Sequence, residues 1–223
     1  MFSVVALLAC VGGVRSAAAA IDVIPKEIVV GKDTEFVQIV NNGNRPEFVN
    51  VSLARLLNPG VPLGDETTQP VGDIERPSLY AYPFRMSLAP GQTKTIVIKP
   101  MQAVDTETVY RLDVRPAINA SSEKRQAMAG SIVVNLGFSA LVRQLPASEK
   151  ASLSVSCDAS GAQLTATGNV RYTVKHAEVD GQPVERFNVY PGVQRPLTGR
   201  VVKIPGQPVC GGRADSAAAV VGQ

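Results

Sequence analysis

The chain has 223 residues, a formal net charge of +3 and no tryptophan. That length is enough for one large or two modest domains, each with its own core. Charges of both signs are interspersed, and no basic block with interleaved aromatic residues occurs, which excludes the usual pattern of a nucleic-acid-binding protein. Valine, threonine, serine, proline and glycine are abundant and long helical periodicity is missing. This composition predicts an all-β sandwich architecture.

The first twenty residues have the pattern of a secretory signal peptide. Residues 4–14 form a short apolar run, and the alanines that follow offer small-x-small cleavage after Ala18 or Ala20. The run is shorter than the roughly 20 apolar residues of a membrane span. A lipoprotein box ending at Cys10 is a weaker alternative, because the apolar run continues past that cysteine. We therefore expect residues 1–20 to be removed on export.

Removal of that segment leaves two cysteines, Cys157 and Cys210. An even pair in an exported protein is most simply a disulfide, and neither cysteine has a partner at metal-ligand spacing. We expect a structural bridge between them and no metal.

Alternating apolar residues predict strands through the first half of the chain. Pro25 lies inside the first of them and limits that segment to a sheet edge or to a strand that changes sheets. Residues 86–88 and 94–99, joined by an Ala-Pro-Gly-Gln turn, predict a hairpin-like unit, and 58–78 and 115–130 predict loops. The predicted strands of this half are 23–30, 34–40, 48–57, 86–88, 94–99, 109–114 and 131–142.

The second half predicts shorter strands with glycine turns and a frayed tail from Gly206 onward. The predicted strands are 153–157, 163–167, 170–179, 187–190 and 200–204. The pattern therefore divides the chain into residues 21–145 and 146–223.

The segment 131–143 is the most informative about function. Val134, Leu136 and Phe138 alternate, so an extended strand would point them to one face, and Ile132 would join them. Arg143 follows just before a linker. An apolar strand left at a sheet edge invites other chains to pair with it. The alternative is one face of an ordinary core strand.

Four motifs resemble a known family. They are Ile-Pro-Lys-Glu-Ile-Val-Val-Gly at 24–31, Leu-Leu-Asn-Pro-Gly at 56–60, Ala-Leu-Val-Arg-Gln-Leu-Pro at 140–146 and Gly-Asn-Val-Arg at 168–171. In this order they resemble the periplasmic chaperones of the chaperone–usher pathway. The resemblance is to the alpha-class branch, which serves fimbriae of the CFA/I, CS1 and cable-pilus type.

The resemblance implies two immunoglobulin-like β-sandwich domains in a boomerang arrangement, located in the periplasm. It implies a protein without enzymatic activity or cofactor that stabilises pilin subunits by donor-strand complementation and delivers them to an outer-membrane usher. Neither nucleic acid nor a small-molecule substrate is expected, and a self-capping homodimer is a further candidate partner.

The resemblance also implies roles for particular residues. Ile132, Val134, Leu136 and Phe138 would form the donor-strand zipper. Lys26 and Arg143 would bind the C-terminal carboxylate of the pilin, and Arg111 and Arg171 are further candidates for the cleft between the domains. If the proline of the 140–146 motif sets the alignment instead, Leu141 takes the anchor position and Arg143 becomes a linker or interdomain residue.

Two alternatives belong to other classes of protein. A fimbrial structural subunit or adhesin-like sandwich would have an N-terminal donor extension and a cysteine pair in the first domain. A sugar-binding or hydrolytic β-domain is disfavoured by the lack of tryptophan and of paired acids and by the lone His176. No nucleophile elbow, phosphate loop or metalloprotease motif is present.

Overall fold

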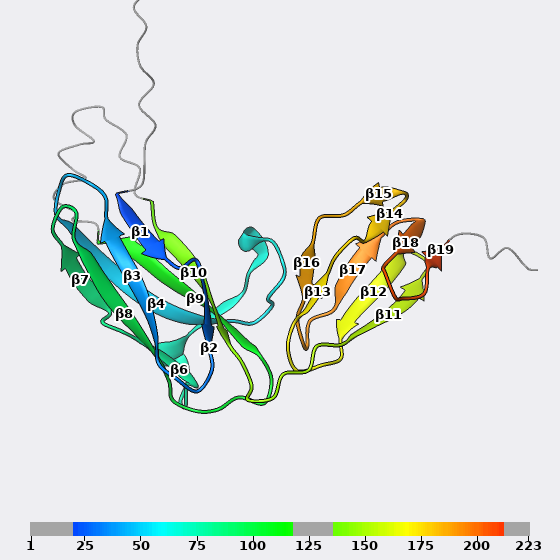
Figure 1. The fold of residues 1–223 in the computed structure, drawn as a ribbon, viewed down its shortest axis with the longest axis horizontal. Helices are drawn as coiled ribbons and strands as arrows, with labels where there is room; N and C mark the ends of the chain where they lie inside the picture. The colour runs from blue at the N-terminus through cyan, green and yellow to red at the C-terminus, as the bar shows by residue number, and fades with distance from the viewer. Residues whose placement is uncertain (1–19, 118–135, 212–223) are drawn as a thin grey trace, which may run out of the picture.

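The computed structural model describes residues 20–117 and 136–211, and Figure 1 shows them as two lobes that meet at an angle. The described residues form strands and two short 3₁₀ turns. Within these ranges no helix is long and apolar enough to cross a bilayer. The expected signal segment up to residue 19 and the expected zipper positions Ile132 and Val134 lie outside the described residues.

The first lobe consists of two facing sheets. Its first sheet has the order β1 (Ile21–Ile24), β3 (Glu35–Asn41), β8 (Thr93–Pro100), β6 (Leu79–Tyr82). The second has the order β2 (Glu27–Val30), β10 (Phe138–Gln144), β9 (Thr108–Pro116), β4 (Glu47–Leu56), β5 (Thr68–Pro70), and β7 (Arg85–Leu88) also pairs with β4. The 3₁₀ turns η1 (Leu63–Asp65) and η2 (Val71–Asp73) flank β5.

Period-two alternation builds the core between these sheets. In β3, Val37 and Ile39 are fully buried while Phe36 and Gln38 are exposed, as expected when successive side chains point to opposite faces. The inward residues of both sheets join into one apolar cluster. The sequence pattern thus predicted this sandwich correctly.

Pro25 separates two strands that belong to different sheets. β1 pairs antiparallel with β3, whereas β2 pairs parallel with β10 in the facing sheet. The predicted strand at 23–30 is therefore two strands, and of the two options that proline allowed, the change of sheet is the one observed. The position of this change determines how much of β10 is covered by β2.

The predicted hairpin of residues 86–88 and 94–99 is wrong. β7 pairs with β4 and β8 pairs with β3, so the turn between them crosses from one sheet to the other. Local turn chemistry identified the turn but could not show which sheet each strand joins. β6 lies in the segment that the prediction left between two elements.

The second lobe contains shorter strands in three small sheets. Their orders are β11 (Leu153–Asp158), β12 (Gly161–Ala166), β17 (Arg195–Thr198); β13 (Tyr172–Val174), β16 (Phe187–Val189); and β15 (Gln182–Pro183), β14 (Glu178–Val179), β18 (Val201–Lys203), β19 (Cys210–Gly211). Their inward residues form a separate apolar cluster.

The predicted disulfide is confirmed. Cys157 of β11 and Cys210 of β19 are bonded across a sequence separation of 53 residues. The expected fraying from Gly206 is wrong as far as residue 211, because β19 pairs with β18 and is held by this bridge.

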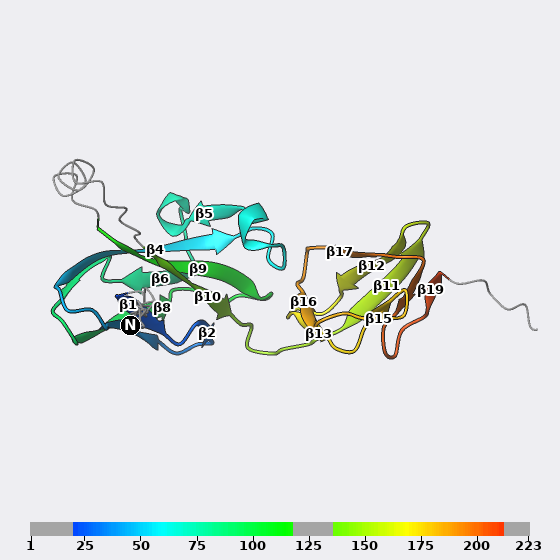
Figure 2. The same ribbon diagram turned by 90° about the horizontal axis from the view of Figure 1, so that it is seen from above.

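The two lobes are joined where β10 ends at Gln144 and β11 begins at Leu153. Figure 2 shows this connection as an extended segment between separate groups of strands. A third apolar cluster spans the boundary and unites Leu56, Val109 and Leu141 of the first lobe with Tyr190 of the second. The lobes are therefore packed against each other as well as tethered.

Candidate functional site

Strand β10 has two halves with different surroundings. Along its whole length it pairs antiparallel with β9, from Phe138 to Gln144. On its other side β2 covers only Leu141 to Gln144. The half from Phe138 to Ala140 therefore has an open edge in the described structure, visible in Figure 1 where β10 extends beyond β2.

The backbone alternation shows which groups face this edge. The amides of Leu141 and Leu145 donate to the carbonyls of Lys26 and Val30, both at 2.9 Å, so odd-numbered residues face the β2 side. Ser139, two residues before Leu141, faces the same side but lies beyond the first residue that β2 pairs. Its amide and carbonyl are placed to pair with an added strand.

Apolar side chains and the cation of Lys26 lie around the edge. Leu136 is 48% exposed, and Phe138 packs partly against the core of the first lobe. The Lys26 ammonium lies 4.3 Å from the centre of the Phe138 ring. The same ammonium forms an ion pair with Asp22, and the Lys26 side chain is 58% exposed. Lys26 and Phe138, far apart in sequence, thus meet at one end of the open edge.

Arg143 is not placed like Lys26. Its side chain is only 10% exposed, and its Nε donates to Oε1 of Glu107 at 2.5 Å while Nη1 lies 3.5 Å from Glu27. Two carboxylates therefore already face this guanidinium. Both carboxylates belong to the first lobe.

Glu107 connects the lobes and was missed by sequence reasoning. Its side chain is fully buried, and its second oxygen accepts the backbone amide of Arg171 at 2.6 Å. Arg171 in turn donates to Glu27 at 2.9 Å and to the Tyr190 hydroxyl at 3.3 Å. Arg171, expected to lie in the cleft, thus contacts both lobes. A lone glutamate between threonines carries no sequence signal of such a role.

A buried polar network positions the segment that carries Glu107. Gln144, 1% exposed, donates to the carbonyl of Gln102 at 2.8 Å and accepts from Ser78 at 2.7 Å. From the second lobe, Asn169 accepts the amide of Glu107 with its carbonyl at 2.8 Å. A Cβ on neighbouring Gly168 would lie 1.8 Å from the carbonyl oxygen of Lys150 in the linker, so this position requires glycine. The Gly-Asn-Val-Arg motif therefore takes part in the contact between the lobes, which we call the hinge region.

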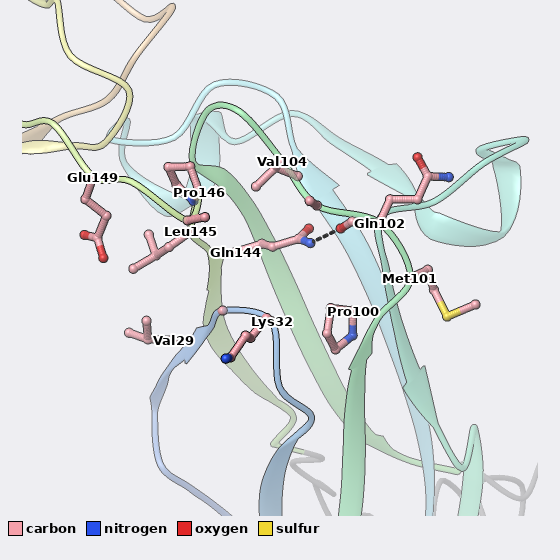
Figure 3. Close-up of a pocket in the computed structure, with 13 residues that line it drawn as sticks. Val29, Lys32, Pro100, Met101, Gln102, Val104, Gln144, Leu145, Pro146 and Glu149 are labelled. Carbon is pink, nitrogen blue, oxygen red and sulfur yellow. Dashed lines mark hydrogen bonds between the residues drawn. The ribbon is translucent and has the colours of Figure 1, made fainter.

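A pocket with a volume of about 680 Å³ lies beside the hinge region, where β10 leads into the linker. Figure 3 shows its lining of Val29, Lys32, Pro146 and Glu149 around the Gln144–Gln102 hydrogen bond. Its walls come from strand ends and the linker, so its shape depends on how the linker lies. It does not include the open edge of β10.

Arg111 also faces the boundary between the lobes, where it lines a smaller pocket with Glu66 and Tyr190. Its Nε donates to Glu66 at 2.8 Å, and a second nitrogen bonds the other carboxylate oxygen. The hydrogen bonds to Glu66 raise the pKa of the Arg111 guanidinium, against the effect of burial. This cation is therefore already paired.

Comparisons with known proteins give two relatives by sequence, both fimbrial proteins from Escherichia coli. One is named as a subunit of CS1 fimbriae; it is 27% identical over 162 residues, which cover 69% of this chain and 65% of that protein's length. The other is named as a subunit of CFA/I fimbriae; it is 25% identical over 172 residues, covering 71% of each chain. No family model matches the sequence.

Among solved structures, the class 5 fimbriae chaperone CfaA aligns with a TM-score of 0.64 and 21% identity, covering 82% of this chain and 90% of that one. A chain from a chaperone–tip adhesin complex of CFA/I fimbriae biogenesis aligns with the same TM-score and identity, covering 83% and 94%. The Salmonella enterica SafA pilin–SafB chaperone complex gives 0.58 and 13%, covering 85% and 90%.

These matches define the fold. The chain has the all-β, two-domain immunoglobulin-like fold of the chaperone–usher periplasmic chaperones, as the sequence predicted. The two matches with a TM-score of 0.64 are the class 5 fimbriae chaperone CfaA and a chain from a CFA/I chaperone–tip adhesin complex, so the likeness in fold extends to the branch that the sequence resembles.

Proposed function

We propose that this protein is a periplasmic chaperone that binds pilin subunits by donor-strand complementation and delivers them to an outer-membrane usher. The open half of β10 is the observation that supports this most directly. The fold likeness adds to it, because the matching structures include chaperones in complex with a tip adhesin and with a pilin. Matching folds that are not enzymes support a role without catalysis or cofactor.

The proposed mechanism follows from an unsatisfied sheet edge. An incomplete sandwich that lacks one strand exposes an apolar groove, and its free edges drive aggregation. The β10 edge would supply the missing ladder through the backbone of Ser139 and its neighbours, while Leu136 and Phe138 enter the groove. Each buried apolar side chain would contribute about 1.5–3 kcal/mol before the cost of association. Ile132 and Val134 would extend this zipper.

Lys26 is the proposed anchor for the partner's terminal carboxylate. It is exposed and lies where the open edge meets β2, so an added strand would end beside it. A charge there fixes register, and a one-residue slip would turn every zipper side chain to the wrong face. For Arg143 we propose the hinge role, because its partners Glu107 and Glu27 are already in place.

The alternative of a fimbrial structural subunit is not favoured, although both sequence relatives are named as fimbrial subunits. The chain contains two lobes with separate cores, and solved chaperones cover both lobes together. The cysteine pair lies in the second lobe, where the structural-subunit interpretation would not place it.

Periplasmic co-expression with the pilin of the same fimbria tests the proposal. Lys26→Ala is expected to lower the steady-state pilin level by about tenfold, because a charge-assisted bond to a carboxylate contributes roughly 1.5–3 kcal/mol. Lys99→Ala, which removes another exposed lysine from the outer face of the other sheet, is the matched control. Both variants should unfold within about 1 kcal/mol of the parent protein, since the Lys26–Asp22 ion pair is exposed.

An unchanged pilin level in Lys26→Ala would remove Lys26 as the anchor. Pilin that accumulates equally with and without the parent protein would overturn the chaperone function itself. Size-exclusion chromatography of the free protein further tests the self-capping homodimer, whose mutual contact would use the same edge.

A further inference from the structure

A pocket of about 200 Å³ lies between the two lobes, separate from the hinge pocket of Figure 3. Leu56, Arg111 and Leu141 line it from the first lobe, and Tyr190 and Arg195 from the second. This volume is below the roughly 300–1,000 Å³ of small-molecule sites, so it suits a single residue of a polypeptide better than a metabolite. Its apolar wall is part of the cluster that joins the lobes.

Arg195 differs from the other arginines at this boundary. Arg111, Arg143 and Arg171 each have a carboxylate partner. Within the described parts of the chain, no carboxylate oxygen lies within ion-pair distance of Arg195. Burial lowers the pKa of the Arg195 guanidinium, as expected for a partly desolvated cation without a counter-ion.

The guanidinium of Arg195 is held in place from two sides. Its Nη1 donates to the carbonyl of Gly60 at 2.7 Å, and its Cζ lies 4.3 Å from the centre of the Phe187 ring. Gly60 has a φ of 98°, and a Cβ there would lie 3.3 Å from the Tyr190 ring. The Asn-Pro-Gly turn therefore requires glycine at position 60, and the carbonyl of this glycine orients Arg195. An arginine fork carries five donors, and this contact uses one of them.

We propose that this pocket binds a carboxylate of the bound polypeptide, with Arg195 as the receptor and the Leu56–Leu141–Tyr190 wall taking an adjacent apolar side chain. The site is additional to Lys26, and its natural ligand rests on the proposed chaperone function. Glu66 does not compete, because Arg111 holds both of its oxygens. The two arginines and one glutamate leave the pocket with one net positive charge.

The carboxylate has two sources, a chain terminus and an acidic side chain. Three peptides separate them: acetyl-trivaline with a free terminus, its C-terminal amide, and the amide of acetyl-Val-Glu-Val. Each is titrated into the whole ¹⁵N-labelled protein while the Nε–Hε resonance of Arg195 is followed by NMR. The expected result is a shift with a carboxylate-bearing peptide and none with the plain amide. The free terminus and the glutamate peptide then show which source binds more tightly.

Arg195→Gln keeps a side-chain donor for Gly60 but removes the charge, and should weaken binding of the preferred peptide roughly tenfold or more. Arg186→Gln, an equal charge change at an exposed position of the same lobe, should leave binding unchanged. Thermal unfolding of both variants checks the fold, and Arg195→Lys, which keeps the charge, should retain part of the binding if the glutamine variant is unstable.

Equal shifts with the amide, equal binding by Arg195→Gln, or no binding of any peptide at millimolar concentration would overturn the proposal. These outcomes are independent of the chaperone function. If the protein raises pilin levels but binds the amide as well as the carboxylate peptides, only the pocket proposal is overturned. If it binds the carboxylate peptides but leaves pilin levels unchanged, the pocket proposal stands and the proposed chaperone function is overturned.

Discussion

The two halves of β10 belong to one continuous strand but differ in how many strands pair with them. From Leu141 to Gln144 the strand lies between β2 and β9, and it contributes the fully buried Val142 and Gln144 to the interior. From Phe138 to Ala140 it has a neighbour on one side only. Both halves mix apolar and polar side chains. The difference arises from Pro25, because β2 begins only after the chain has changed sheets there.

This contrast separates structural from functional residues more clearly than composition does. Residues in the covered half hold the molecule together, and Arg143 is the clearest case, since it joins β10 to Glu107 and Glu27. In the open half, Ala140 is buried in the core, whereas the backbone edge at Ser139 is available to a partner. Substitutions in the covered half should therefore lower stability, and substitutions that alter the open edge should lower binding.

The largest effect is expected from Arg143→Ala. It leaves the Glu107 carboxylate buried without its strongest partner, so the free energy of unfolding should fall by about 3–5 kcal/mol. Denaturant unfolding followed by circular dichroism measures this. The double variant Arg143→Met with Glu107→Leu should recover most of the loss, because it removes both charges. A loss below about 1 kcal/mol in the single variant would mean that the pair behaves like a surface ion pair.

Two separate proline substitutions test the backbone of β10 and have the next largest expected effect. Ala140→Pro removes an amide on the β9 side and should destabilise the protein by about 1–3 kcal/mol, since a buried carbonyl loses its donor. Ser139→Pro removes an amide on the open side and should leave the unfolding midpoint nearly unchanged while pilin binding falls about tenfold. Similar destabilisation by both prolines would show that the edge at Ser139 is already occupied in the free protein.

The zipper side chains should show the same separation. Leu136→Asp is expected to weaken pilin binding roughly 10–150-fold, the equivalent of about 1.5–3 kcal/mol, without changing stability. Phe138→Asp should weaken binding similarly but also lower stability slightly, because Phe138 packs on the core. Phe36→Asp, which alters a 61% exposed side chain on the other sheet, is the control. Equal binding by all three variants and the parent would place the zipper elsewhere.

The sequence predicted the parts of this arrangement that depend on local pattern. Alternation predicted most strands of the first lobe, and the proline at 25 left only two options, one of which is observed. The cysteine count predicted the bridge between Cys157 and Cys210. The strand pattern and the proline are visible within a few neighbouring residues. The disulfide follows because only two cysteines remain after the expected signal peptide.

Contacts between distant segments could not be predicted in this way. Glu107 meets Arg143 and Arg171 only because two lobes come together, and nothing in its neighbours marks it as buried. The same holds for Arg195 and the carbonyl of Gly60, which are 135 residues apart. The family resemblance made Arg143 a candidate anchor, whereas its burial and its two carboxylate partners support the other role that we propose for it.

The smallest expected effect concerns the ion pair between Asp22 and Lys26. The hydrogen bond from Lys26 lowers the pKa of Asp22 below its ordinary value of 3.8. A carboxyl whose pKa is lower in the folded state adds stability above the ordinary value, and this contribution disappears as the pH falls through the lowered one. Because both side chains are substantially exposed, the contribution should stay within about 0–1 kcal/mol.

Asp22→Asn separates the two roles of Lys26. At neutral pH the variant should unfold slightly more easily than the parent, and the difference should vanish in acid, where the parent's Asp22 is protonated as well. Its affinity for pilin should rise modestly, since Lys26 no longer has an internal carboxylate that competes with the partner's terminus. Unfolding free energies at the two pH values and a pilin titration at neutral pH measure both effects. Weakened binding would instead show that Asp22 orients Lys26. Pilin binding at the open edge would then depend on the ion pair rather than on a free Lys26 cation.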